Sequence, residues 1–240
     1  KIDMIRIAAN DLGNPLTAIK SGVELMLEFD RDKLDKQQIE DLTIMKSAAN
    51  RMRDMIDNIL SLERIERLAQ MEVSDVVDFT ERVKRAVEEY RPQAQSKKQQ
   101  LVAKLPEGIP AYVEGDVAQL YEALTNLISN AVKYTPDGGS VQVIVDLDDG
   151  RLSFQVVDTG FGIPEDQQDR LFQPFYRAKT QETSEIDGNG LGLHLVKNII
   201  ERHQGRMIFE SVYGEGSVFG FILPTVDVPV AENRQTPDAV

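Results

Sequence analysis

The stretch GDVAQLYEALTNLISNAVKYTPDGG, residues 115–139, decides the fold of the second half of this chain. Its apolar residues recur at helical spacing, and Pro136 and the following glycines end the pattern, so it predicts one amphipathic helix. Asn126 and Asn130 lie four residues apart and share one face of that helix, and Lys133 follows within a turn. An amide oxygen suits a hard cation and a lysine suits a phosphate. Polar residues on a solvated helix face are the alternative interpretation.

Three stretches that contain glycines follow this helix: DTGFGI (158–163), GNGLGL (188–193) and GEGS (214–217). Glycines let the backbone approach a ligand closely. The second stretch runs into a helical pattern, which would place free N–H groups beside a polyphosphate. Asp158, at the end of a predicted strand, is suited to accept a hydrogen bond from an exocyclic amine such as that of adenine. Each stretch alone is a weak signal, because GEGS reads equally well as a hairpin turn.

Strands alternate with helices on both sides of these motifs. Two hairpins are predicted, 140–147 with 151–158 around Asp149-Gly150, and 206–212 with 217–224 around YGEG. A helix at 78–95 and a strand within 99–108 precede them. The order predicts a layered α/β domain with a mixed sheet over residues 71–224, followed by a flexible tail at 225–240.

Residues 1–70 have a different period, in which apolar residues recur alternately every three and four positions. The first series comprises Ile2, Ile5, Ala9, Leu12, Leu16, Ile19, Val23 and Met26. After a polar break the pattern resumes between Leu42 and Ile59. It predicts two long helices in a hairpin, whose wide apolar faces a second copy would cover in a four-helix bundle. A plain coiled-coil spacer is the alternative.

Composition narrows the classes of function. The net charge is −13, from 27 basic and 40 acidic residues, which disfavours nucleic acid as a partner. There are no cysteines and only two histidines, so a zinc cluster is not expected. No run approaches the roughly 18 apolar residues of a membrane segment. We expect a cytoplasmic protein, and the helical pattern already present at Lys1 suggests a piece of a longer sensor.

The segments EALTNLISNAVKYTP, DTGFGI, FQPFYR, GNGLGL and GEGS resemble, in order and spacing, the N box and G boxes of sensor histidine kinases. The resemblance covers residues 1–224. It implies an α+β chain of two domains: a dimerisation hairpin at 1–70, and at 71–224 an ATP-binding α/β sandwich of the histidine kinase and gyrase class. It further implies a homodimer through the N-terminal helices, the cofactors ATP and Mg²⁺, and the receiver domain of a response regulator as partner.

The resemblance also implies the role of each polar residue on the 115–139 helix and beside it. Asn130 would bind Mg²⁺, and Asn126 would shape the same face. Lys133 and Arg177 would neutralise phosphate charge, and Tyr134 would line the nucleotide pocket. The gyrase-type ATPases use a glutamate where this chain has Asn126. A neutral amide is no general base, so this position favours a kinase over an ATPase.

The glycine motifs would form the remaining walls of the nucleotide site. Asp158 would bind the adenine amine, and Gly160 and Gly162 would shape the wall beside it. Residues 178–187 would form a mobile lid over ATP. The phosphate-facing turn would contain Gly188, Gly190, Leu191 and Gly192.

The segment NDLGNPLTAIK, residues 10–20, resembles the phosphoacceptor segment of the family with one change. Aligned on Pro15-Leu16, the phosphoaccepting histidine is Asn10. Asp11 would orient and deprotonate that histidine, and Asn14 would position a water for phosphatase activity. An amide nitrogen gives its lone pair to the carbonyl, so Asn10 cannot replace an imidazole. Neither His194 nor His203 is expected to substitute for it.

Two explanations of Asn10 stay open. One is an engineered loss of the acceptor in an otherwise intact kinase, whose native reaction would pass a phosphoryl group from ATP to a helix histidine and then to a response-regulator aspartate. The other is a natural pseudokinase or a phosphatase-type, ATP-binding regulator of a response regulator. Both predict that autophosphorylation is lost in this chain.

Overall fold

The computed structural model describes residues 2–29, 33–68, 75–106, 111–184, 186 and 188–226. The predicted boundary between residues 70 and 71 and most of the predicted tail, residues 227–240, lie outside this described part. Thr225 and Val226, which sequence analysis assigned to the tail, donate backbone hydrogen bonds to Gly150 O at 2.9 Å and Tyr112 O at 3.0 Å. These two residues are therefore joined to the α/β domain.

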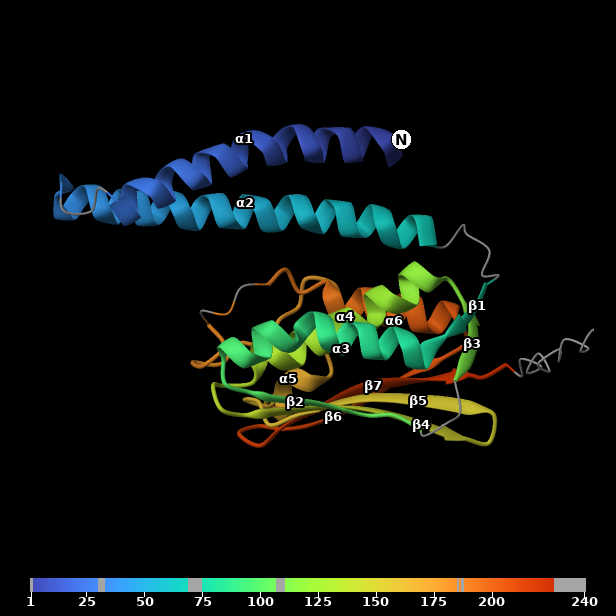
Figure 1. Ribbon diagram of the computed structural model, residues 1–240. Coiled ribbons are helices and arrows are strands. Elements are labelled where there is room, and N and C mark those ends of the chain that lie inside the picture. The colour runs from blue at the N-terminus through green and yellow to red at the C-terminus, as the bar shows by residue number, and fades with distance from the viewer. Residues whose placement is uncertain are drawn as a thin grey trace, which may run out of the picture.

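The N-terminal part is a hairpin of two long helices, α1 (Ile2–Phe29) and α2 (Lys36–Leu68), which lie side by side in Figure 1. Asp35 and Gln38 open α2 with a reciprocal capping box: Gln38 N donates to Asp35 Oδ1 at 2.8 Å, and Asp35 N donates to Gln38 Oε1 at 2.9 Å. Leu16 of α1 packs with Ala49 and Ile56 of α2 in the buried seam between the helices. The predicted hairpin is confirmed.

The second half contains a mixed five-stranded sheet in the order β2-β4-β5-β7-β6. Its strands are β2 (Gln100–Lys104), β4 (Ser140–Asp148), β5 (Arg151–Asp158), β6 (Arg206–Val212) and β7 (Gly216–Pro224). β2 pairs with β4 in parallel and the other pairs are antiparallel, which confirms the predicted mixed sheet and both hairpins. A small antiparallel sheet of β1 (Asp75–Asp78) and β3 (Tyr112–Gly115) was not predicted.

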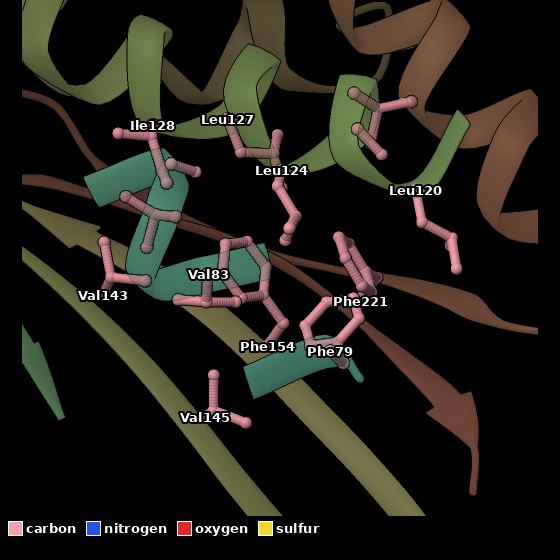
Figure 2. Packing of buried hydrophobic residues seen from close by; sticks show 14 of the residues in the cluster. Phe79, Val83, Leu120, Leu124, Leu127, Ile128, Val143, Val145, Phe154 and Phe221 are labelled. Atoms are coloured by element: carbon pink, nitrogen blue, oxygen red, sulfur yellow. The ribbon is translucent and has the colours of Figure 1, made fainter. Parts of the chain in front are cut away.

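The helices α3 (Phe79–Ser96), α4 (Val117–Tyr134) and α6 (Gly192–Arg202) lie together on one face of the five-stranded sheet (Figure 1). A short helix, α5 (Glu165–Gln168), follows β5. Phe79, Phe154 and Phe221, from α3, β5 and β7, meet in the core with ring centroids 5.0–5.9 Å apart (Figure 2). Phe79 meets the other two rings edge-on, which is a geometry that aromatic pairs favour. Every helix of the described residues is too short or too polar to cross a membrane.

The start of α4 is fixed by a buried histidine. The carboxylate of Asp116 caps the helix by accepting from the N–H groups of Ala118 and Gln119, each at 2.9 Å. Asp116 N donates to His203 Nε2 at 3.0 Å, and His203 Nδ1 lies 2.7 Å from Ile199 O. Nδ1 must therefore carry the proton, and burial lowers the pKa of this ring. His203 thus joins the end of α6 to the start of α4, a structural role.

Candidate functional site: a cavity beside α4

A cavity of about 280 Å³ lies between α4, the end of β5 and the segment from Phe161 to Leu193. This volume is slightly below the about 300–1,000 Å³ that is typical of ligand pockets. Ten residues proposed from the sequence line it: Asn126, Asn130, Lys133, Tyr134, Asp158, Gly162, Arg177, Gly188, Gly190 and Gly192. Gly160 and Leu191, also proposed from the sequence, are not among the residues that line it, and Leu191 is only 1% exposed. The fold thus gathers into one cavity residues that are up to 66 positions apart in the chain (126 to 192).

Asp158 is a buried carboxyl in the wall of this cavity. Burial raises the pKa of its carboxyl to about 6, against the opposing effect of backbone hydrogen bonds from Gly160 and Ser217. The bond from Gly160 N to Asp158 Oδ1 measures 2.8 Å. A Cβ atom at Gly160 would lie 2.5 Å from that same oxygen, so only glycine fits there. The carboxyl keeps acceptor capacity that faces the cavity.

The asparagine face of α4 forms the second wall. Asn126 Nδ2 donates to Glu122 O at 2.9 Å, and its Oδ1 lies against Gly192 at the start of α6. The side chain of Asn130 is half-buried and has no hydrogen bond within the described part of the chain. Its amide oxygen is therefore available to a ligand in the cavity.

Two cationic side chains of the cavity wall, Lys133 and Arg177, flank Gly188. A Cβ atom at Gly188 would lie 3.0 Å from Lys133 Nζ and 3.9 Å from Arg177 Cζ. Arg177 Nη1 donates to Gly188 O at 2.8 Å, and Nη2 donates to Ile186 O. The guanidinium therefore holds the segment before the glycine turn, a role that sequence analysis did not assign to it. Its expected contact with phosphate stays a prediction.

The remaining walls come from residues that the sequence analysis missed. The main apolar ones are Phe161, Ile163, Leu171, Leu193 and Phe219. Phe161, Ile163 and Leu193 stand inside the recognised glycine stretches, so the motifs themselves were a signal for them. Leu171 and Phe219 carry no motif. Only the pairing of β7 with β5 and β6 places Phe219 on the inner side of the sheet.

The proposed phosphoacceptor segment lies in the first half of α1. Asp11 and Asn14 are exposed, whereas the side chain of Asn10 is outside the described residues. Pro15 lies inside the helix, where it cannot donate to the carbonyl of Asp11. Thr17 Oγ1 donates to Gly13 O at 2.9 Å, which satisfies another carbonyl beside the proline. The hairpin contacts the α/β domain through α2 and α6.

Comparison with known proteins gives matches to two family models. Residues 1–68 match the His Kinase A (phospho-acceptor) domain. Residues 115–227 match the Histidine kinase-, DNA gyrase B-, and HSP90-like ATPase family. Together the two matches include the hairpin and most of the α/β domain.

Curated relatives match over nearly the whole of this chain. The adaptive-response sensory kinase SasA of Crocosphaera subtropica is 35% identical over 230 residues, 93% of this chain and 59% of that protein. The sensor histidine kinase RppB of Synechocystis sp. is 31% identical over 226 residues, 94% of this chain and 49% of that protein. The chain therefore spans between about half and six tenths of the length of these relatives.

Solved structures agree with the fold. Full-length ShkA, crystallised in complex with AMPPNP, superposes with a TM-score of 0.66 at 24% identity, covering 95% of this chain and 47% of ShkA. The mycobacterial sensor histidine kinase MprB superposes with a TM-score of 0.55 at 28% identity, covering 64% of this chain and 98% of that chain.

The fold is an α/β sandwich with a cavity beside α4, joined to a helical hairpin. The two domain matches and the curated relatives identify the family to which this arrangement of domains belongs. The chain belongs to the sensor histidine kinases of two-component systems.

Proposed function

We propose that this chain binds Mg-ATP in the cavity beside α4, as the catalytic part of a sensor histidine kinase. One observation carries the proposal: a single cavity is lined by a buried carboxyl, Asp158, and by the cations Lys133 and Arg177. The carboxyl suits the exocyclic amine of adenine, and the cations suit the phosphates. The cavity thus offers a partner to each of the two ends of ATP.

The start of α6 supports a phosphate near these cations. The helix begins at Gly192 without a hydrogen bond from a capping side chain. The first N–H groups of a helix have no hydrogen-bond partner within the helix. These groups and the helix dipole both favour the binding of an anion at this end. Gly188 and Gly190 precede these groups, and a side chain on either would meet neighbouring atoms at 3.0 Å or less.

The same wall fits a divalent cation. Asn130 presents an unbonded amide oxygen, which is a ligand type that Mg²⁺ accepts. No group of three His, Asp or Glu side chains in the described residues is arranged for a metal, so the ion would rest on Asn130 and on oxygens of the nucleotide and water. When bound, Mg²⁺ would offset the charge of the phosphate oxygens.

This chain would bind ATP without passing the phosphoryl group to residue 10. Phosphoryl transfer depends mainly on positioning and charge neutralisation, which the cavity residues supply, and on a nucleophile to receive the group. The amide of Asn10 is no such nucleophile. In the native reaction of this family, a helix histidine at that position would receive the phosphoryl group and a response-regulator aspartate would receive it next.

The test compares this chain with its Asn10→His variant. Both are titrated with ATP and Mg²⁺ by calorimetry and then incubated with ATP labelled at the γ-phosphate. We expect both to bind ATP with equal affinity and only the variant to be labelled at residue 10. Asn10→His/Asp158→Ala, the control, should lose binding and label together. Label on residue 10 of the unchanged chain, or a variant that binds ATP but stays unlabelled, would overturn the kinase proposal.

We further propose a homodimer through the hairpin. Three residues of α1 spaced seven apart, Leu12, Ile19 and Met26, are 56%, 53% and 50% exposed in the single chain. Met45 and Met52 of α2, also seven apart, are 50% and 51% exposed. Apolar side chains at heptad spacing are typical of a helix–helix interface, so a second hairpin would cover them in a four-helix bundle.

A phosphatase acting on a response regulator is the second candidate function. Asn14 is exposed one turn beyond residue 10, and orienting a water does not require a histidine nucleophile. The test incubates a phosphorylated receiver domain with this chain and with its Asn14→Ala variant, with and without ATP. If the unchanged chain removes the phosphate faster than Asn14→Ala does, the result supports the phosphatase function. If the two proteins remove it at the same rate, or if neither removes it, the result excludes this function.

A further inference from the structure

The C-terminal turn of α4 is held by a lysine from outside the helix. The last carbonyls of a helix have no partner within it. Lys97, which follows α3, places Nζ at 2.9 Å from Val132 O, 3.1 Å from Lys133 O and 2.6 Å from Thr135 O. An ammonium has three donors and no acceptor, so these carbonyls engage its full hydrogen-bonding capacity.

Gln99 also binds two of the carbonyls that accept from Lys97. Its side chain is buried, and Nε2 donates to Val132 O at 3.0 Å and to Thr135 O at 2.6 Å. The backbones of the two turns are joined as well, since Gly138 N donates to Lys97 O at 2.9 Å and Gln100 N donates to Gly139 O at 2.9 Å. We call the Lys97 and Gln99 side chains on the carbonyls of residues 132, 133 and 135 the Lys97 cap.

The Lys97 cap is coupled to the nucleotide cavity through the one carbonyl that it does not bind. Tyr134 O accepts a hydrogen bond from Phe161 N of the first glycine stretch at 3.2 Å. Lys133, Tyr134 and Phe161 all line the cavity, whereas Lys97 does not. The cap therefore fixes the backbone that carries Lys133 and Tyr134, and through Tyr134 O it also holds Phe161.

The charge of Lys97 suits this position electrostatically. A cation near a helix C-terminus is stabilised by the helix dipole, and a hydrogen bond from a charged donor is stronger than a neutral one. Partial burial lowers the pKa of the Lys97 ammonium, and Asp137 opposes that effect. Arginine would not be equivalent, because its donors lie in one planar fork and cannot converge on three carbonyls of a helix end.

We propose that Lys97 is a positioning residue for the nucleotide site, which acts by fixing the end of α4 so that Lys133, Tyr134 and Phe161 keep their places around the ligand. The part that concerns ATP rests on the proposed function above. A residue that merely stabilised the domain would change the unfolding temperature and leave the ATP affinity of the folded protein unchanged.

The experiment compares Lys97→Met with the matched variant Lys98→Met. Lys98 is the next residue, is exposed and loses the same charge, so it controls for electrostatic attraction of the nucleotide. Calorimetry with ATP and Mg²⁺ is done at a temperature where circular dichroism shows both variants folded. Loss of charged hydrogen bonds should weaken binding by Lys97→Met about tenfold, and Lys98→Met should bind like the unchanged chain.

Hydrogen exchange supplies a second readout that needs no nucleotide. In Lys97→Met the amide of Phe161 should exchange about tenfold faster, because its acceptor on Tyr134 is no longer fixed. The amide of Val156, inside the sheet on β5, should exchange at its original rate. If the unchanged chain does not bind ATP, the proposed function fails, while this exchange measurement still decides the role of Lys97.

Two results would overturn the inference: equal ATP affinity in Lys97→Met and Lys98→Met, or unchanged exchange at Phe161. Should Lys97→Met not fold, both measurements are made on Lys97→Gln, whose shorter amide keeps two donors. That variant should show the same two changes by a smaller factor. Absence of both changes in a folded Lys97→Gln would likewise overturn the inference.

Discussion

Gly192, the first residue of α6, lies so close to Asn126 on α4 that a Cβ atom there would stand 2.7 Å from Asn126 Oδ1. That distance is shorter than van der Waals contact. The absence of a side chain at Gly192 therefore lets the two helices approach and brings the start of α6 beside the asparagine face. A side chain at Gly192 would displace the end of the Asn126 side chain and not the backbone of either helix. Glycine at this position therefore matters more for the geometry of the site than for the fold.

We expect Gly192→Ala to weaken ATP binding about tenfold, because Asn126 must turn away and lose its 2.9 Å hydrogen bond to Glu122 O. The free energy of unfolding should change by less than about 1 kcal/mol, since alanine favours the helix over glycine. Calorimetry and urea denaturation measure the two effects. Gly22→Ala, a site with no atom within 4 Å of the added Cβ, is the control and should bind ATP normally. Unchanged affinity in Gly192→Ala would contradict the assigned contact.

Asp158 predicts a pH-dependent difference in stability. Its pKa is about 6 in the folded protein against 3.8 for the unperturbed group, so the folded protein holds the proton more tightly than the unfolded chain. Stability therefore falls as the pH rises from about 4 to 6, and the cost is fully present above that window. Asp158→Asn removes the cost. Its free energy of unfolding should exceed that of the unchanged chain by about 1–3 kcal/mol at pH 8.

The measurement is urea denaturation of both proteins at pH 8 and pH 4. At pH 4 the difference should vanish, because the wild-type carboxyl is then neutral too. The same variant should bind ATP more weakly at pH 8, since an amide nitrogen facing the adenine amine repels it. An advantage in stability that persists unchanged at pH 4 would show that burial of the charge is not its cause.

The next prediction separates the charge of Arg177 from the planar shape of its guanidinium group. Arg177→Lys keeps the positive charge but replaces the planar guanidinium, whose two terminal nitrogens bond Gly188 O and Ile186 O, by one nitrogen on a shorter side chain. We expect the segment 178–184 to be cleaved several-fold faster by a protease in the absence of nucleotide, because its C-terminal end is released. Limited proteolysis followed by mass spectrometry reads this directly. Cleavage at the original rate would mean that the guanidinium does not hold the segment.

The proposed dimer interface can be tested at Ile19. Ile19→Glu places a charge in the exposed heptad stripe of α1 and should convert a dimer to a monomer, as measured by light scattering after gel filtration. Ser21→Glu adds the same charge about half a turn away on the opposite side of the helix, and it should leave the dimer intact. A dimer that survives Ile19→Glu would place the interface elsewhere.

Local patterns in the sequence were sufficient for the main helices and strands. The period of apolar residues identified α1, α2 and α4, and the turn residues Asp149-Gly150 identified the hairpin of β4 and β5. The short β1 and β3 were missed, because four-residue strands pair with partners far along the chain and have little pattern of their own. The heptads predicted the hairpin, but they did not tell which positions face the partner helix. In the single chain Leu16 and Val23 are buried and Leu12 and Ile19 are not.

The sequence by itself determined the family, the main elements and ten of the residues that line the cavity, because motifs and periodicity are local properties. Only the tertiary structure decided how these residues are used. It left Gly160 and Leu191 out of the cavity lining, turned Arg177 onto two backbone carbonyls and brought Lys97 to the end of α4. Such roles depend on hydrogen-bond partners between 9 and 38 residues away, and the distance in space between those partners is set by the packing of helices on the sheet.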